Sequence, residues 1–155
     1  MKKIVLGLLL LLFCANLSFA QTDQVNIINQ NELTKLVKEN RGKIILLNFF
    51  ATWCPPCKVE IPELARIREK YSNSELLVIG LSVDEDTDEI LPFIEKNGVN
   101  YPVYKADKSI TDHFGISSVP HNSFFAKDGQ MVISEPGMAD SEILQQVIDD
   151  LMERK

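Results

Sequence analysis

Two cysteines separated by two prolines are the residues of this 155-residue sequence whose types and spacing favour chemistry. Cys54 and Cys57 enclose Pro55 and Pro56, an arrangement that holds two thiols close enough to interconvert between a dithiol and a disulfide. A bridge across two residues closes a very short loop and adds little stability, so a purely structural disulfide is the weaker interpretation. The motif therefore predicts thiol–disulfide exchange.

The chain around the motif is predicted to place Cys54 at the start of a helix. Residues 44–50 form an apolar and aromatic run typical of a buried strand, and residues 55–71 follow a helical pattern. Free backbone N–H groups and the dipole at a helix N-terminus stabilise a thiolate. We therefore expect Cys54 to be the exposed, attacking thiol and Cys57, one turn further along, to be a more buried resolving thiol.

The same cysteines could also bind a metal. A structural zinc site needs four ligands. After the N-terminal apolar segment, which contains Cys14, the chain supplies one Cys-x-x-Cys pair with His113 and His121 and no second paired motif, which disfavours zinc. A copper chaperone that uses Cys54, Cys57 and His121 remains an alternative. No nucleotide, flavin or haem motif is present, so we expect no cofactor.

The N-terminus has the pattern of a secretory signal peptide. Met1-Lys2-Lys3 is basic, an apolar run follows, and small residues stand at Ser18 and Ala20, which predicts cleavage after Ala20. An uncleaved anchor helix is the alternative, and cleavage is favoured over it because the apolar run is short for the roughly 20 residues that span a bilayer. Lipidation of Cys14 is disfavoured, because Phe13 is bulky where lipidation motifs have a small residue. We expect residues 1–20 to be the signal and the protein to be periplasmic or otherwise extracytoplasmic.

Removal of that signal would also remove Cys14 and leave Cys54 and Cys57 as the cysteines of a single domain at residues 21–155. The composition, 45% hydrophobic and 25% charged, is ordinary for a globular protein. The net charge of −6 and the lack of a basic stripe argue against nucleic acid as a partner. We expect a monomer.

Strands and helices are predicted to alternate along this domain. The expected strands are residues 25–28, 44–50, 76–83, 101–104, 122–126 and 130–134, and the expected helices are residues 31–39, 55–71, 88–96, 109–114 and a last one from Ser141. The sequence Asp128-Gly129 is typical of a hairpin turn between the last two strands. The acids Asp84, Glu85 and Asp86 would suit the positive end of the third helix. The pattern indicates an α/β fold with a central mixed β-sheet flanked by helices on both faces.

Residues 48–62 (NFFATWCPPCKVEIP) resemble the active-site segment of TlpA/ResA-type thiol-disulfide oxidoreductases, which have a thioredoxin fold. The sequences Phe114-Gly115-Ile116, Val119-Pro120 and Lys127-Asp128-Gly129 are similar to that family's cis-proline loop and hairpin. The resemblance covers most of residues 43–153 and implies the same fold here. It also implies that the Val119–Pro120 peptide is cis, with its loop against the Cys54 sulfur and its backbone open to an extended substrate.

Glu60 is the expected proton partner of Cys57. It lies three residues after Cys57, inside the apolar stripe of the helix, although a carboxylate that reaches the surface is the usual alternative. Burial would raise its pKa and suit it to exchange a proton with the resolving thiol, a role that the resemblance implies. Asn48 stands where thioredoxins have a buried acid, and we expect it to be an ordinary hydrogen-bonded amide of the sheet.

Other residues near the motif are expected to contact substrate. The resemblance assigns Trp53, Pro55, Pro56, Val119 and Pro120 to the substrate-binding surface. His113 is expected at the surface. His121 could be a solvated loop residue, or a charge near the thiolate that tunes its pKa.

The resemblance implies an exported protein that reduces disulfides of substrate proteins, for example in cytochrome c maturation, and is recharged by a membrane thiol-disulfide reductase. A disulfide-forming oxidase of the same fold is the first alternative. A peroxidase is disfavoured because the proline and threonine setting expected before a peroxidatic cysteine is missing.

Overall fold

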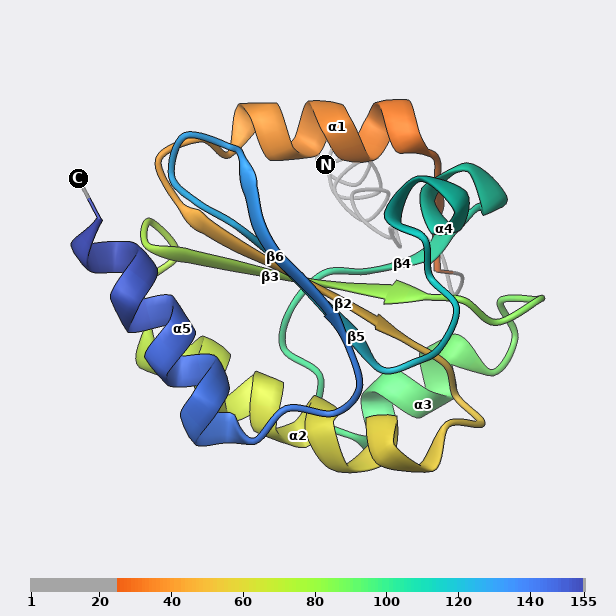
Figure 1. Cartoon of the computed structure of the whole chain (residues 1–155). Coiled ribbons are helices and arrows are strands. Elements are labelled where there is room, and N and C mark those ends of the chain that lie inside the picture. The colour runs from red at the N-terminus through yellow and green to blue at the C-terminus, as the bar shows by residue number, and fades with distance from the viewer. Residues whose placement is uncertain (1–24, 155) are drawn as a thin grey trace, which may run out of the picture.

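A computed structural model describes residues 25–154 as a six-stranded sheet with helices on both faces (Figure 1). The strands are β1 (Ile27–Ile28), β2 (Ile44–Phe50), β3 (Leu76–Ser82), β4 (Val103–Ala106), β5 (His121–Phe125) and β6 (Met131–Pro136), and the helices are α1 (Gln30–Glu39), α2 (Pro55–Lys70), α3 (Ile90–Lys96), α4 (Lys108–Phe114) and α5 (Ser141–Glu153). The signal peptide expected at residues 1–20 lies outside the described part of the chain.

The sheet is mixed, as the sequence predicted. Its strand order is β1-β4-β3-β2-β5-β6. The pairs β1–β4, β4–β3 and β3–β2 are parallel, whereas β5 runs antiparallel to both β2 and β6. The β5–β6 hairpin turns at Gly129, whose φ of 80° lies in the region that glycine favours. The α/β class, the hairpin and the order of elements are therefore confirmed.

Strand β2 lies inside the sheet and is buried on both faces. All seven of its residues are buried, because β3 and β5 pair with its two edges and helices cover its two faces. Ile44 and Leu46 pack with α2 and α5, and the alternating residues Ile45, Leu47 and Phe49 pack with α1 and α4. Asn48 shares the face of Ile44 and Leu46, so it points toward α2.

Three details differ from the expected elements. Strand β4 lies at Val103–Ala106, two residues later than the expected 101–104. The first strand is shorter than expected, since only Ile27 and Ile28 pair with β4. Helix α3 begins at Ile90 rather than Asp88, and its first turn contains no acid. The expectation that Asp84, Glu85 and Asp86 complement the helix dipole is therefore wrong. The chain between β3 and α3 uses Asp84 in another way, described below.

Leu64 packs α2 against the sheet as part of a buried apolar cluster. Its side chain is fully buried in the cluster that includes Ile44 and Leu46 of β2. We expect Leu64→Ala to lower the free energy of unfolding by about 2–5 kcal/mol, because it leaves a cavity in a packed core. Urea unfolding measures this loss. The matched control is Ile143→Ala, at a site that is 54% exposed, and an equal loss in both variants would contradict the packing described here.

Candidate active site

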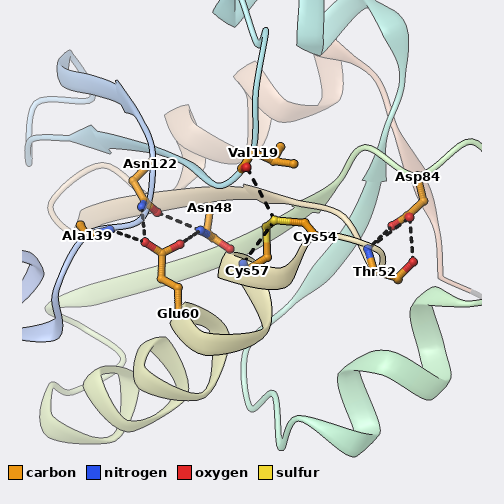
Figure 2. Close-up of a disulfide and its surroundings, with 9 residues drawn as sticks. All are labelled: Asn48, Thr52, Cys54, Cys57, Glu60, Asp84, Val119, Asn122 and Ala139. Atoms are coloured by element: carbon orange, nitrogen blue, oxygen red, sulfur yellow. Dashed lines mark hydrogen bonds between the residues drawn. A yellow bond between two sulfur atoms is a disulfide. The ribbon is translucent and has the colours of Figure 1, made fainter.

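Cys54 and Cys57 form a disulfide at the start of α2 (Figure 2). Cys54 is the N-cap residue of the helix, and the backbone N–H of Cys57 donates a hydrogen bond to Cys54 Sγ at 3.2 Å. Pro55 and Pro56 occupy the first helical positions, where a missing N–H costs nothing. A thiolate on Cys54 would keep this N–H donor and face the positive end of the helix. The predicted helix N-terminus is confirmed.

Burial does not distinguish the two sulfurs as expected. Cys54 is 2% exposed and Cys57 is fully buried, so the expectation of an exposed Cys54 is wrong for the disulfide form. The reason is the loop that precedes β5: Cys54 Sγ lies 3.6 Å from the carbonyl oxygen of Val119. The two cysteines therefore differ in their position on the helix, with Cys54 at the N-cap, and not in their exposure to solvent.

The Val119–Pro120 peptide is cis, as the resemblance implied. Its loop lies against the disulfide, and the backbone N–H of Gly137 donates to the Pro120 carbonyl oxygen at 2.7 Å. This bond ties the loop to the end of β6. The geometry leaves the backbone of Val119 beside the sulfur that would carry a substrate.

Glu60 is 2% exposed, so the alternative of a surface carboxylate is wrong. Three N–H donors meet its carboxylate: Asn48 Nδ2 at 2.8 Å, Asn122 Nδ2 at 2.8 Å and the backbone N–H of Ala139 at 2.9 Å (Figure 2). Burial raises the pKa of Glu60, while the three hydrogen bonds favour its charged form and oppose that rise. The side chain is therefore a buried acid whose proton affinity is set by its neighbours.

Asn48 is only half satisfied, contrary to the expectation of an ordinary sheet amide. Its Nδ2 donates to Glu60 and, at 2.9 Å, to Asn122 Oδ1. Its Oδ1 is buried and accepts no hydrogen bond. Asn48 and Asn122 are directly paired across β2 and β5, which explains why both amides reach the same carboxylate. Sequence reasoning missed Asn122, although an amide on the paired strand was the available signal.

His121 lies in β5 and is 6% exposed, so it is not a solvated loop residue. It pairs with Phe49, packs edge-on against that ring at 5.8 Å and has Nε2 at 2.8 Å from Ser134 Oγ. Burial lowers the pKa of His121, and the negative charge of Glu135 opposes this effect. The lowered pKa disfavours the alternative in which His121 carries a positive charge. His113 is exposed on α4, as expected.

The copper site proposed from sequence does not form in the described structure. His121 shares the sheet face of Phe49, whose ring packs with α1 and α4, whereas the cysteines lie on the α2 side. Within residues 25–154, no three side chains of His, Cys, Asp or Glu are grouped so that they could hold a metal ion. The combination of Cys54, Cys57 and His121 is therefore wrong as a ligand set.

Asp84 is a site residue that sequence reasoning assigned to another role. Its carboxylate accepts the backbone N–H of Thr52 at 3.1 Å, the Thr52 hydroxyl at 2.8 Å and the Ser82 hydroxyl at 2.6 Å (Figure 2). These bonds fix the turn that leads from β2 into the motif. The parallel pairing of β2 and β3 brings Thr52 and Asp84 to the same edge of the sheet, and this was the signal available in the sequence.

The residues expected to contact substrate surround the disulfide. Trp53 is 67% exposed and borders a cavity of about 320 Å³ with Lys58, Pro92 and Lys96 among its lining residues. Pro55 and Pro56 are exposed, whereas Val119 is partly buried and Pro120 is buried. Substrate contact by these residues stays a prediction.

The mixed sheet, the Cys-x-x-Cys disulfide at a helix N-terminus and the facing cis-proline loop define a thioredoxin-like protein with a disulfide-bonded cysteine pair. The chain belongs to the AhpC/TSA family, whose sequence model matches residues 17–135. This match covers most of the domain, including the cysteine pair and the cis-proline.

Individual relatives agree with this assignment. The chain is 31% identical over 97 residues to thiol-disulfide oxidoreductase ResA of Bacillus thuringiensis (strain Al Hakam), a match that covers 62% of this chain and 56% of the relative. With ResA of Bacillus subtilis (strain 168) it shares 28% over 142 residues, covering 81% and 79% of the two chains. The chain thus spans little more than half the length of the first of these relatives.

Solved structures show the same fold. A thiol:disulfide interchange protein from Chlorobium tepidum TLS superposes with a TM-score of 0.69 at 23% identity, covering 74% of this chain and 83% of that one. A thioredoxin-like protein from Neisseria meningitidis gives a TM-score of 0.69 at 26% identity, covering 76% and 80%. The predicted thioredoxin fold is confirmed.

The hydrogen bonds to Asp84 are expected to hold the turn before Trp53. Asp84→Ala leaves the Thr52 N–H and the Ser82 hydroxyl without their partner, which should cost about 1–3 kcal/mol in the free energy of unfolding. Chemical denaturation measures this cost. Asp86→Ala, at an exposed site of the same loop, is the matched control, and similar stability in both variants would show that the contacts carry little free energy.

The raised pKa of Glu60 predicts a pH-dependent difference in stability. A carboxyl whose folded-state pKa exceeds its unfolded value of 4.5 stabilises the fold when protonated, and this stabilisation is lost as the pH rises through the folded-state pKa. The free energy of unfolding of Glu60→Gln, minus that of the unmodified protein, should therefore increase above pH 4.5 and then level off.

Unfolding curves at a series of pH values measure this difference. Glu85→Gln, at an exposed position, controls for the loss of one negative charge. A difference between Glu60→Gln and the unmodified protein that is flat or falls with pH would show that the pKa of Glu60 is not raised.

Proposed function

We propose that this chain is an exported thiol-disulfide oxidoreductase that reduces disulfides of substrate proteins by dithiol exchange through Cys54 and Cys57. The observation that carries the proposal is the position of their disulfide, at the N-terminus of α2 and against the cis Val119–Pro120 peptide. The similarity to relatives named thiol-disulfide oxidoreductase ResA supports the same activity.

The reaction begins with the Cys54 thiolate. It attacks one sulfur of a substrate disulfide, and the other substrate sulfur leaves with the electron pair and takes up a proton. Cys57 then loses its proton and attacks Cys54 Sγ, which releases the first substrate sulfur as a thiolate that is protonated in turn. Two electrons pass to the substrate, and the Cys54–Cys57 disulfide forms.

The chain's own groups support each step. The Cys57 N–H and the helix N-terminus stabilise the Cys54 thiolate. The Val119 backbone lies beside Cys54 Sγ, where an extended substrate segment would pair with it. Glu60 is the proposed acceptor of the Cys57 proton, because it is a buried acid one helical turn away with a raised pKa.

Residues Trp53, Pro55, Pro56, Val119 and Pro120 form the proposed substrate surface. We place the protein in the periplasm or an equivalent extracytoplasmic space, after cleavage of the signal at residues 1–20 or anchored by it. In residues 25–154 no helix has the length and hydropathy of a membrane span. A membrane thiol-disulfide reductase is the proposed electron donor, the domain is proposed to act as a monomer, and cytochrome c maturation is the proposed pathway.

Trapping of mixed disulfides tests the exchange mechanism. Cys57→Ala keeps the attacking thiol and lacks the group that releases substrate, so it should accumulate mixed disulfides with envelope proteins. Cys54→Ala, the matched control, should trap few, because attack needs the first thiol. Non-reducing gels followed by mass spectrometry identify the adducts, and equal trapping by both variants, or by neither, contradicts the proposal.

Two further measurements on the unmodified protein separate the proposed reductase from an oxidase and from a peroxidase. A reduction potential well above the poise of the compartment would favour a disulfide-forming oxidase, whereas a potential below it favours the proposed reductase. Rapid consumption of peroxide by the reduced protein would favour a peroxidase.

A further inference from the structure

The side-chain oxygen of Asn48 is buried and takes no part in the exchange mechanism described above. Among the described residues, Asn48 Oδ1 is the one fully buried side-chain nitrogen or oxygen without a hydrogen-bond partner. Such an atom is costly to leave unpaired, and native proteins contain few of them. An unpaired acceptor next to a redox-active pair can gain a partner when the redox state changes.

The chemistry of the neighbouring groups fixes the orientation of the Asn48 amide. Its nitrogen faces Glu60 Oε2 at 2.8 Å and Asn122 Oδ1 at 2.9 Å, which are both acceptors. The reversed amide would point an oxygen at a carboxylate and at a second amide oxygen, with no donor between them. The oxygen of Asn48 must therefore lie on the side away from Glu60.

That side is the side of Cys57. Cys57 and Glu60 are three residues apart on α2, so they share one face of the helix, and both are at least 98% buried against the sheet. Asn48 projects from β2 toward this face, because it alternates with residues that pack on α1 and α4. Figure 2 shows its nitrogen toward Glu60 and its oxygen toward Cys57.

In the disulfide form Cys57 Sγ has no hydrogen to donate. On reduction, one thiolate of an external dithiol attacks Cys54 Sγ, and the Cys54–Cys57 bond breaks with its electron pair on Cys57 Sγ. Cys57 then takes up one proton, which balances the proton lost by the donor thiol. The second donor thiol then loses its proton and attacks the donor sulfur bound to Cys54. Cys54 leaves with the electron pair and can take up that proton, and the donor leaves as a disulfide. The new Cys57 S–H is a hydrogen-bond donor in a buried site.

We propose that Asn48 is a positioning residue that couples Cys57 to Glu60: its Oδ1 accepts a hydrogen bond from the Cys57 thiol in the reduced protein, while its Nδ2 keeps its bond to Glu60. The inference rests on the proposed thiol-exchange function and adds a redox-dependent hydrogen bond to it. This bond stabilises the protonated, reduced state of Cys57, and it relieves the unpaired oxygen of the oxidised state.

Two leucine substitutions separate this bond from the general effect on Glu60. Asn48→Leu and Asn122→Leu each remove one N–H donor from the Glu60 carboxylate, and each replaces an amide by an apolar group of similar size. Only Asn48→Leu removes the acceptor on the Cys57 side. Asn122→Leu is therefore the matched control.

Equilibration with glutathione measures the outcome. Asn48→Leu should shift the exchange equilibrium toward the protein disulfide by about three- to tenfold relative to Asn122→Leu, which lowers the reduction potential by about 15–30 mV for a two-electron couple. Equal shifts in the two variants would place the effect in Glu60 and overturn the inference, as would no shift in either.

The pKa of Cys57 supplies a second readout, measured by alkylation in a Cys54→Ser background. Asn48→Leu should lower this pKa, because an acceptor for the S–H favours the neutral thiol. Asn48→Asp keeps an oxygen on the Cys57 side and adds negative charge, so it should raise the pKa instead. Changes of the same sign in the two variants contradict the proposal, and the aspartate variant keeps it testable if the leucine variant does not fold.

The S–H stretching band of Cys57 in infrared spectra is a direct signature of the bond. In the reduced Cys54→Ser protein the band should lie at the lower frequency of a hydrogen-bonded thiol, and Asn48→Leu should return it to the frequency of a free thiol. An unchanged band would show that another group, such as a buried water, meets the thiol.

These readouts are independent of the proposed function. If the Cys57→Ala variant fails to trap mixed disulfides but the reduced Cys54→Ser protein shows the Asn48-dependent band, the function fails and the hydrogen bond stands. If trapping succeeds and the band, the pKa and the potential do not respond to Asn48, the inference fails alone.

Discussion

The rest of the site depends on the hydrogen bonds that hold the buried carboxylate of Glu60. An ionised group in this position would be costly without partners, and three N–H donors from β2, β5 and the loop before α5 converge on it. Because Glu60 belongs to α2, these bonds fix the rotation of that helix relative to the sheet. The cysteine pair lies one turn earlier on the same helix, so the carboxylate also sets the orientation of Cys57.

Side chains alternate between the two faces of the sheet along β2 and β5. One face carries the amides that bind Glu60, and the other carries packed aromatic rings. Asn48 and Asn122 form a cross-strand pair on the face toward α2, where they meet Glu60. Phe49 and His121 form the next pair on the opposite face, where they pack near α4. A shift of β5 by one residue against β2 would turn Asn122 to the apolar face of Phe49 and bring His121 or Ser123 beside Asn48 and the carboxylate.

The sequence predicted most of the fold and the centre of the site, and the failures have physical causes. The cysteine motif, the buried Glu60 and the two sheet faces follow from local periodicity, which is why residues 44–50 and the start of α2 were placed correctly. The roles of Asn122, His121 and Asp84 depend on which strands pair and in which register. A single sequence does not encode that pairing locally, so a histidine after a proline gave no sign that it would face away from the cysteines.

Asp84 and Glu60 show how the same chemical group can serve two different purposes at one site. Asp84 is 8% exposed at the edge of the sheet, and hydroxyl and backbone donors surround it, so its charge is satisfied by groups that also need a partner. Glu60 is buried deeper, and the donors that reach it only partly offset the loss of water, which raises its pKa. A carboxylate that is fully matched is suited to hold a turn. A carboxylate that is undercompensated is suited to exchange a proton, and Glu60 lies one helical turn from Cys57, the thiol whose proton it is proposed to take.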